Sequence, residues 1–207
     1  MPEQSYHHKN LKAQLIAQGL KLLDTEGYAG FSLRKAAKLC GVSQTAPYRH
    51  FQSKDDLIRA IAEQALDEFA ASLRAAVAQY PGQPQAQLEE MGVAYIRFFV
   101  ENPEYLRLFF LSDVRLRVRL FANDQEKRHN ETYGILQSVI DRCAGEAAAA
   151  DSRDRMLLYS WGLVHGIAAL MVSGEVKNDE RTLALAEQIV RGHTSLLGEK
   201  RSMQEKT

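Results

Sequence analysis

The stretch GVSQTAPYRHF, residues 41–51, places several hydrogen-bonding side chains within a few positions of one another. Gln44 can pair bidentately with adenine, and Thr45 offers a hydroxyl and a methyl group. The Tyr48 hydroxyl and the His50 ring can donate hydrogen bonds to phosphate oxygens. This combination of side chains is typical of a surface that contacts a nucleic acid.

Two side chains of this stretch also have structural explanations. Tyr48 can be a core aromatic residue, and Arg49, which can reach a phosphate or a guanine, can be a solvated surface charge. Val42 and Phe51 are the apolar residues that can anchor the stretch to a core. A helix packed on several sides would not leave so many polar groups outward, so the sequence favours the binding interpretation.

Two short helices must hold this stretch in place. Ser32 can cap a helix over residues 33–40, which ends at Gly41, because glycine tolerates the positive φ of a helix exit. Ser43 can cap the next helix, and the pair forms a helix-turn-helix whose second helix enters the major groove of DNA. Pro47 cannot donate the first intrahelical bond to Ser43, so we expect this recognition helix to begin irregularly or to start later.

A longer helix capped by Ser53 is expected next, running to about Gln79, before Pro81. Lys54 lies in its first turn, where the positive end of the helix dipole adds to the lysine charge and doubly favours a phosphate. Residues 1–54 hold eight basic and three acidic side chains, a net +5, so the rest of this neutral chain carries −5. The asymmetry indicates that the N-terminal end meets a polyanion, although chance and solvated helix faces can also produce it.

The rest of the chain is also predicted to be helical, which makes the protein all-α. Apolar residues recur at helical spacing in five further segments: 85–101, 103–111, 133–143, a segment from 151 or 152, and 183–197. The end of the chain, 199–207, is expected to be loose. The segment VRLRVRLF alternates apolar and basic side chains, and we interpret it as an irregular or extended link between helices. Its basic residues are either an anion-binding trio or, as we favour, solvated charges: Arg115, Arg117 and Arg119.

Composition narrows the chemistry further. The chain has 207 residues, of which 45% are hydrophobic and 25% charged, as in ordinary soluble proteins. Cys40 and Cys143 form no C-x-x-C pair, so we expect no metal, disulfide or cofactor, and a reducing, cytoplasmic location. The N-terminus lacks the apolar core of a signal peptide. Residues 156–172 are apolar but shorter than the roughly 20 residues of a membrane span and include His165, so we predict a buried helix.

Three motifs in the first third of the chain follow one another in a specific order: EGYAGFSLRKAAKLCGVS, PYRHF and SKDDLIRAI. With them, residues 9–66 resemble the DNA-binding region of the TetR family of transcriptional regulators. The resemblance implies a three-helix helix-turn-helix domain (1–55), joined by a long helix to a C-terminal helical ligand-binding and dimerisation domain (56–198), and a flexible tail (199–207). The residues then predicted to contact DNA are Arg34, Ser43, Gln44, Thr45, Ala46, Tyr48, Arg49, His50 and Lys54.

The apolar stretch SWGLVHGIAALMVSG carries Gly162 and Gly166 four positions apart, so that they share a helix face and let another helix approach closely. The stretch resembles the Trp-His-Gly signature in the C-terminal domain of one TetR subgroup. In that family the last two long helices pair with their twins in a four-helix dimer interface. The interface is therefore predicted to include Gly162, Gly166, Ala169, Leu183, Ala186, Val190 and Leu197.

TetR-like proteins are sensors in which a small molecule enters the C-terminal domain and the two DNA-reading heads move apart. The candidate ligand contacts are the aromatic residues of that domain and one histidine: Phe98, Tyr105, Phe109, Tyr133, Trp161 and His165. The alternative is that the aromatic residues are plain core and that His165 is a hydrogen-bonded core histidine.

The resemblance thus implies a ligand-responsive transcriptional regulator, usually a repressor, that binds a double-stranded inverted-repeat operator as a homodimer and is released by a small-molecule effector of unknown identity. No membrane partner is expected. The alternatives are a helical enzyme and a non-specific DNA-binding protein, each with a helix-turn-helix end. An enzyme is disfavoured because the sequence has no nucleophile elbow, glycine-rich phosphate loop or H-E-x-x-H motif. Non-specific packaging of DNA calls for a strongly basic chain, whereas this one is neutral.

Overall fold

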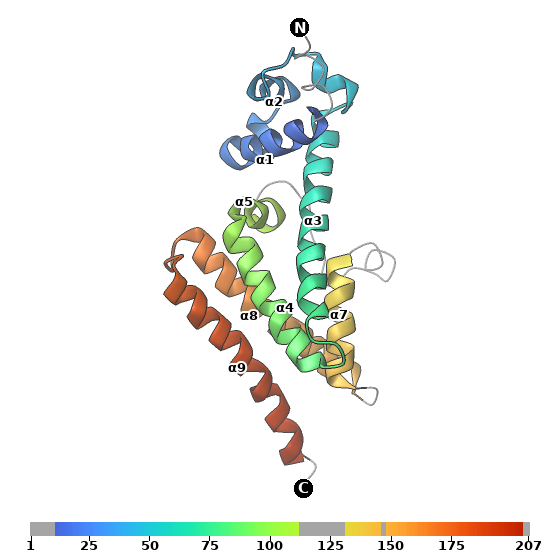
Figure 1. The fold of residues 1–207 in the computed structure, drawn as a ribbon, viewed down its shortest axis with the longest axis vertical. Helices are drawn as coiled ribbons and strands as arrows, with labels where there is room; N and C mark the ends of the chain where they lie inside the picture. The colour runs from blue at the N-terminus through green and yellow to red at the C-terminus, as the bar shows by residue number, and fades with distance from the viewer. Residues whose placement is uncertain (1–10, 112–130, 146–147, 205–207) are drawn as a thin grey trace. The chain divides into compact units, whose positions relative to one another are not determined.

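The computed structural model of this chain describes residues 11–111, 131–145 and 148–204, and every regular element within those ranges is a helix (Figure 1). The all-α prediction is therefore confirmed. By its internal contacts the chain divides into two compact units. The first contains the described residues up to Asp67 together with residues 104–111, and the second contains residues 68–103 together with the described residues from 131 onward.

Up to Asp67, the first unit contains three helices and the start of a fourth: α1 (Leu11–Gly30), α2 (Leu33–Leu39), the 3₁₀ helix η2 (Ala46–Arg49) and α3 (Lys54–Ala78). Ser32 caps α2 as predicted, because its hydroxyl accepts a hydrogen bond of 3.3 Å from the Lys35 amide. Gly41 follows α2 with φ 68°, the left-handed conformation expected of the helix exit. The core of this unit includes several side chains without exposed surface: Leu15, Ala36, Ala37 and Leu57.

The recognition segment differs from the helix that the sequence predicts. Ser43 does not cap an α-helix with its side chain; Thr45 occupies the N-cap position of η2 and makes no capping hydrogen bond there. Its backbone hydrogen bonds instead join residues three positions apart. For example, the Tyr48 amide donates to the Thr45 carbonyl at 3.2 Å. Pro47 explains the difference, since it has no amide hydrogen to bond to Ser43. The expected late and irregular start of this helix is confirmed.

Gly27 interrupts α1. Its φ of 64° and ψ of −177° lie outside the helical region, and a short turn then carries the chain on to Gly30. At the head of α3, the Ser53 hydroxyl accepts from the Asp56 amide at 3.2 Å, which confirms the predicted cap.

The segment after α4 packs with the first unit. It consists of α5 (Pro103–Leu106) and a π-helical turn, Arg107–Leu111, so the predicted helix at Pro103 is confirmed but changes geometry along its length. The Arg107 guanidinium donates to both carboxylate oxygens of Asp24 on α1, with Nη2 lying 2.9 Å from Oδ2. The segment VRLRVRLF, with Arg115, Arg117 and Arg119, lies outside the described residues.

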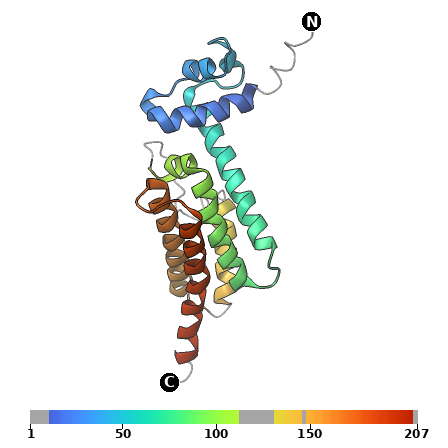
Figure 2. The same ribbon diagram turned by 60° about the vertical axis from the view of Figure 1, so that its left-hand side comes forward.

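The second unit packs three helices around α4 (Pro84–Glu101): α7 (Glu131–Ala144), α8 (Ala150–Ser173) and α9 (Glu180–Gln204). Figure 2 shows α4, in green, beside α8 and α9. Gly92 allows this closeness, because a Cβ atom there would lie 2.8 Å from Val190 Cγ1 and 3.2 Å from Val164 Cγ1. The helix α9 extends through residues 199–204, which the sequence analysis predicted to be loose.

The helix α8 is less buried than its sequence predicts. It is long and apolar enough to cross a membrane by length and composition, but an ordinary core helix passes the same test. Only 28% of its most apolar stretch is buried within this chain, so the prediction of a buried helix is wrong for this chain taken alone. The exposed side chains on it include Leu158, Tyr159 and Leu170.

Candidate nucleic-acid interface

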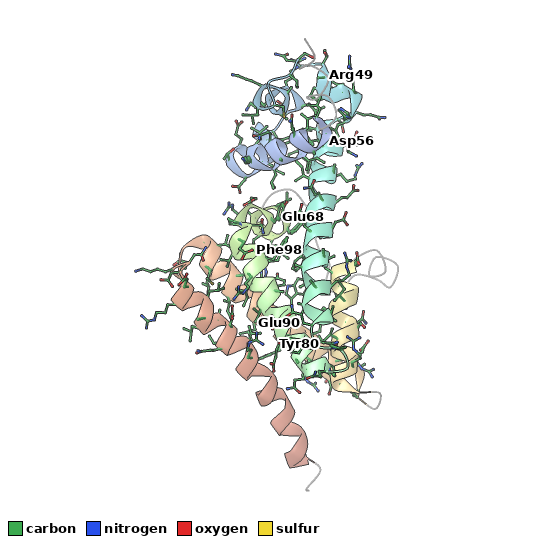
Figure 3. All side chains as sticks on the ribbon, viewed as in Figure 1. Arg49, Asp56, Glu68, Tyr80, Glu90 and Phe98 are labelled. Atoms are coloured by element: carbon green, nitrogen blue, oxygen red, sulfur yellow. The ribbon has the colours of Figure 1, made fainter. Side chains whose placement is uncertain are left out.

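The predicted DNA-contacting residues gather on the outside of the first unit. Pro47 and Phe51 are buried and fix the recognition segment to the core. The residues around them turn outward: Arg34, Ser43, Gln44, Thr45, Tyr48, Arg49 and His50 are all exposed, and Ala46 is half-buried. Figure 3 shows Arg49 at the outer edge of this unit. Tyr48 is 52% exposed, so its alternative role as a core aromatic residue is excluded.

Several of these side chains have no partner within the described part of the chain. Arg34, Gln44 and Arg49 make no side-chain hydrogen bond or ion pair there. By contrast, the neighbouring Lys35 forms an ion pair with Glu26 and donates to the Gly30 carbonyl at 2.9 Å. Exposed donors that are not engaged by their own protein are available to an external acceptor, which is what readout of base edges and phosphates requires.

The head of α3 is held by capping hydrogen bonds. The Asp56 carboxylate accepts from the backbone amides of Gln52 and Ser53, both at 3.1 Å, while the Ser53 hydroxyl accepts from the Asp56 amide. This reciprocal arrangement satisfies amides that a helix start otherwise leaves open. Figure 3 shows Asp56 at this end of α3. Lys54 is thereby presented from a fixed backbone.

Lys54 also has a partner that the sequence analysis missed. Its ammonium nitrogen lies 3.7 Å from the centre of the Tyr28 ring and 3.3 Å from the Tyr28 carbonyl oxygen. The Tyr28 hydroxyl in turn donates to Asp55 at 2.9 Å. The only available sequence signal was the position of Tyr28 directly after Gly27, which by itself says nothing about which helix the tyrosine reaches.

A second polar cluster lies between α4 and α8 in the second unit. The Tyr95 hydroxyl accepts from Trp161 Nε1 at 3.2 Å and lies 3.0 Å from His165 Nδ1. Burial raises the pKa of Tyr95, so the phenol stays protonated, and burial lowers the pKa of His165. From the sequence alone Tyr95 is only one member of the apolar face of residues 85–101, because a buried tyrosine looks like core until its hydroxyl partner is known.

The pKa of His165 leads to a testable pH dependence. The pKa of His165 in the folded state lies below the ordinary value of 6.5. As the pH falls below 6.5, the unfolded chain therefore binds a proton at this histidine more readily than the folded chain does. The free energy of unfolding consequently decreases as the pH falls. We expect His165→Gln to flatten this dependence between about pH 7 and pH 5. Thermal unfolding of both proteins across that range measures the difference. Equal slopes for the two proteins would contradict the prediction.

The predicted ligand contacts divide between the two units. Tyr105 and Phe109 are buried in the first unit, where their rings stack with centres 6.4 Å apart. The other four are in the second unit: Phe98, Tyr133, Trp161 and His165. Phe98, labelled in Figure 3, packs its ring 5.0 Å from that of Phe69, which in turn lies 5.3 Å from Tyr95. Phe98, Trp161 and His165 are thus joined through Phe69 and Tyr95.

An open hollow of about 480 Å³ lies elsewhere in the second unit, lined by Asp141, Arg142, Gly145 and Arg153. Its arginines are already engaged. Arg142 donates to the Gln87 side chain at 2.9 Å, and Arg153 donates to the Gly145 carbonyl at 3.0 Å and pairs with Asp141. We therefore do not assign an effector to this hollow.

The predicted dimer residues fall into two groups. Gly162 and Gly166 have open space where a Cβ would stand, and Ala169 and Leu183 are half-buried. Ala186 and Val190, however, are each only 3% exposed, because they face the interior of their own unit. Leu197 lies in the part of α9 whose side chains the structure does not describe. Among the described side chains of α9, the large apolar ones that face outward are Leu185, at 56% exposure, and Ile189, at 43%.

Comparison with known proteins gives two family matches. Residues 15–61 match the profile described as bacterial regulatory proteins, tetR family, and residues 88–193 match the tetracyclin repressor-like C-terminal domain. The second match spans more than half of the chain. It is not specific to the Trp-His-Gly subgroup, which remains a prediction.

Solved structures show the same architecture. A protein with unknown function from Rhodococcus sp. RHA1 is 25% identical, with a TM-score of 0.69 over 94% of this chain and 97% of that chain. A TetR family transcription regulator from Marinobacter aquaeolei VT8 is 14% identical, with a TM-score of 0.69 over 89% and 95%. A putative tetR family regulator from Shewanella sp. PV-4 is 21% identical, with a TM-score of 0.65 over 88% and 97%. A search of curated proteins gives no match.

Proposed function

This chain belongs to the TetR family of bacterial regulatory proteins, and we propose that it acts as a repressor that binds an inverted-repeat operator as a homodimer and leaves it when a small molecule binds the second unit. Family membership makes it a DNA-binding transcription regulator rather than an enzyme. Beyond family membership, we propose the operator geometry, the dimer surface and the position of the effector.

The observation that carries the proposal is the set of exposed side-chain donors on α2 and the recognition segment that have no partner in the described part of the chain. Gln44 lies just before η2, where its amide can pair with a base edge, and Arg34 and Arg49 add positive charge that no carboxylate among the described residues pairs with. Within η2 itself, the short 3₁₀ geometry carries the exposed Tyr48 and Arg49 on a single turn. Enrichment of a common half-site from a random duplex pool tests the proposal, and the absence of any enriched sequence would contradict it.

Base readout by Gln44 predicts a position-specific effect. We expect Gln44→Ala to cost about 1–3 kcal/mol of binding at one base pair of each half-site and to relax the preference there. The measurement is affinity for the selected site and for each of its single-base variants. Gln52→Ala, a change at another exposed glutamine of the same unit, is the matched control and should leave the preference intact. A uniform loss over all sequences would show that Gln44 only positions the segment.

The dimer surface is supported by the outward apolar residues of α8 and α9. Leu158, Leu170, Leu185 and Ile189 are each more than 40% exposed, a large apolar exposure for two neighbouring helices. Gly162 and Gly166 leave room along α8 for a facing helix to approach. A two-fold pairing of this face would put two recognition segments on half-sites about one helical turn, or a multiple of it, apart.

The effector site is supported by the polar cluster of Tyr95, Trp161 and His165 within an aromatic surround. A pocket for a small molecule combines apolar walls with a few placed polar groups, and this cluster provides both. The effector can release DNA only if it binds the conformation that does not fit the operator more tightly than the one that does.

A further inference from the structure

Lys54 differs from Lys35, the other lysine that contacts the backbone of residues 28–30. Lys35 is neutralised by Glu26, whereas Lys54 forms no ion pair with a carboxylate in the described part of the chain. Its two contacts are both with Tyr28: the face of the ring at 3.7 Å and the carbonyl oxygen at 3.3 Å. The ammonium is therefore held in place while its positive charge remains available.

The backbone explains how Tyr28 reaches Lys54, although the two are far apart in sequence. Gly27 adopts φ 64°, a conformation that side-chain-bearing residues rarely take, and this turns the chain away from the line of α1. No atom lies within 4 Å of a Cβ built at Gly27, so the constraint on that position is its backbone and not the space around it. The turn brings both the ring and the carbonyl of Tyr28 to the head of α3.

The tyrosine is itself fixed at its far end. Its hydroxyl donates to Asp55 Oδ1 at 2.9 Å, and that hydrogen bond raises the pKa of Tyr28, which keeps the hydroxyl protonated and the bond intact. Asp55 thus binds the tyrosine rather than the lysine. The ring is 38% exposed, so it forms part of the surface of the unit and not of its core.

From these contacts we propose that Tyr28 is the positioning residue that aims Lys54 at a DNA phosphate. An aromatic face attracts an ammonium without cancelling its charge, and the carbonyl uses only one of its three donors. A lysine whose ammonium is already held in one position loses less side-chain freedom on binding a phosphate than a free one. The inference rests on the proposed function, because it requires that this unit binds DNA.

The salt dependence of DNA binding tests the role, and a random-sequence duplex is a sufficient probe because phosphate contacts do not depend on sequence. We expect Lys54→Ala to reduce the slope of log affinity against log salt by about 0.9, the value for one phosphate. Tyr28→Leu should produce most of the same loss, whereas Tyr28→Trp, which keeps an aromatic face, should retain the parental slope. In the Tyr28→Leu background, Lys54→Ala should have little further effect.

Two further results separate positioning from folding and from DNA binding itself. Tyr28→Phe removes the bond to Asp55 but keeps the ring, so its slope should lie close to the parental value if the ring holds Lys54. Thermal unfolding of each variant shows whether the unit is folded. Equal losses for Lys54→Ala in the parental and Tyr28→Leu backgrounds would overturn the positioning role. A parental protein that does not bind the duplex at all would instead overturn the proposed function.

Discussion

Leu185→Glu is expected to convert the protein from a dimer to a monomer and to weaken binding to an inverted-repeat site by about 100-fold or more. The residue is 56% exposed on α9, and a two-fold axis through this face would bring a glutamate near its own copy in an apolar surround. A monomer binds each half-site alone and loses the advantage of linked binding, which is commonly a factor of about 10²–10⁴. Light scattering and affinity for full and half sites measure both effects.

The matched control is Ala75→Glu, which adds the same charge at an exposed helical position of the same unit, on α3. It should leave the dimer and the DNA affinity unchanged. Because Leu185 is exposed, its replacement should alter the stability of the monomer by no more than about 0.5 kcal/mol, so a folding defect would not explain the loss. A Leu185→Glu protein that remains a dimer at micromolar concentration would place the interface elsewhere.

Trp161→Ala is expected to lower the free energy of unfolding by about 3 kcal/mol, the lower end of the range for such truncations, because the side chain is half-buried rather than fully buried. The change removes both the ring and the hydrogen bond that its Nε1 donates to Tyr95. Denaturant unfolding measures the loss. If Trp161 also lines the effector site, the response of DNA binding to an effector should disappear while binding without the effector persists.

Trp161→Phe separates the two contributions. It keeps most of the ring but removes the donor to Tyr95, so we expect a loss of about 1 kcal/mol, the net value of a typical hydrogen bond. Identical losses for the phenylalanine and alanine variants would mean that the ring contributes little and that the hydrogen bond dominates. A change below about 0.5 kcal/mol for Trp161→Ala would contradict a structural role altogether.

The local elements were predictable because their causes are local. The Ser32 and Ser53 caps, the exit at Gly41 and the late start of η2 at Pro47 all follow from the hydrogen-bonding capacity and backbone preference of single residues. The family motifs lie in this same part of the chain. The polar residues that face outward could be identified there from the sequence, because each short helix has only a few apolar residues that can pack on the core.

The sequence by itself determined an all-helical chain with an N-terminal DNA-binding region, because apolar periodicity and helix caps depend on residues that are close together in the sequence. Only the tertiary structure decided which faces pair. It showed that Ala186 and Val190 are buried within their own unit, Val190 against Gly92, that Tyr95 joins Trp161 to His165, and that Tyr28 holds Lys54. Each of these contacts joins residues distant in sequence. A periodic apolar stripe indicates that one face of a helix is buried, but it does not indicate which other helix buries that face. The reason is that the hydrophobic effect is non-directional, so any apolar partner can cover the stripe.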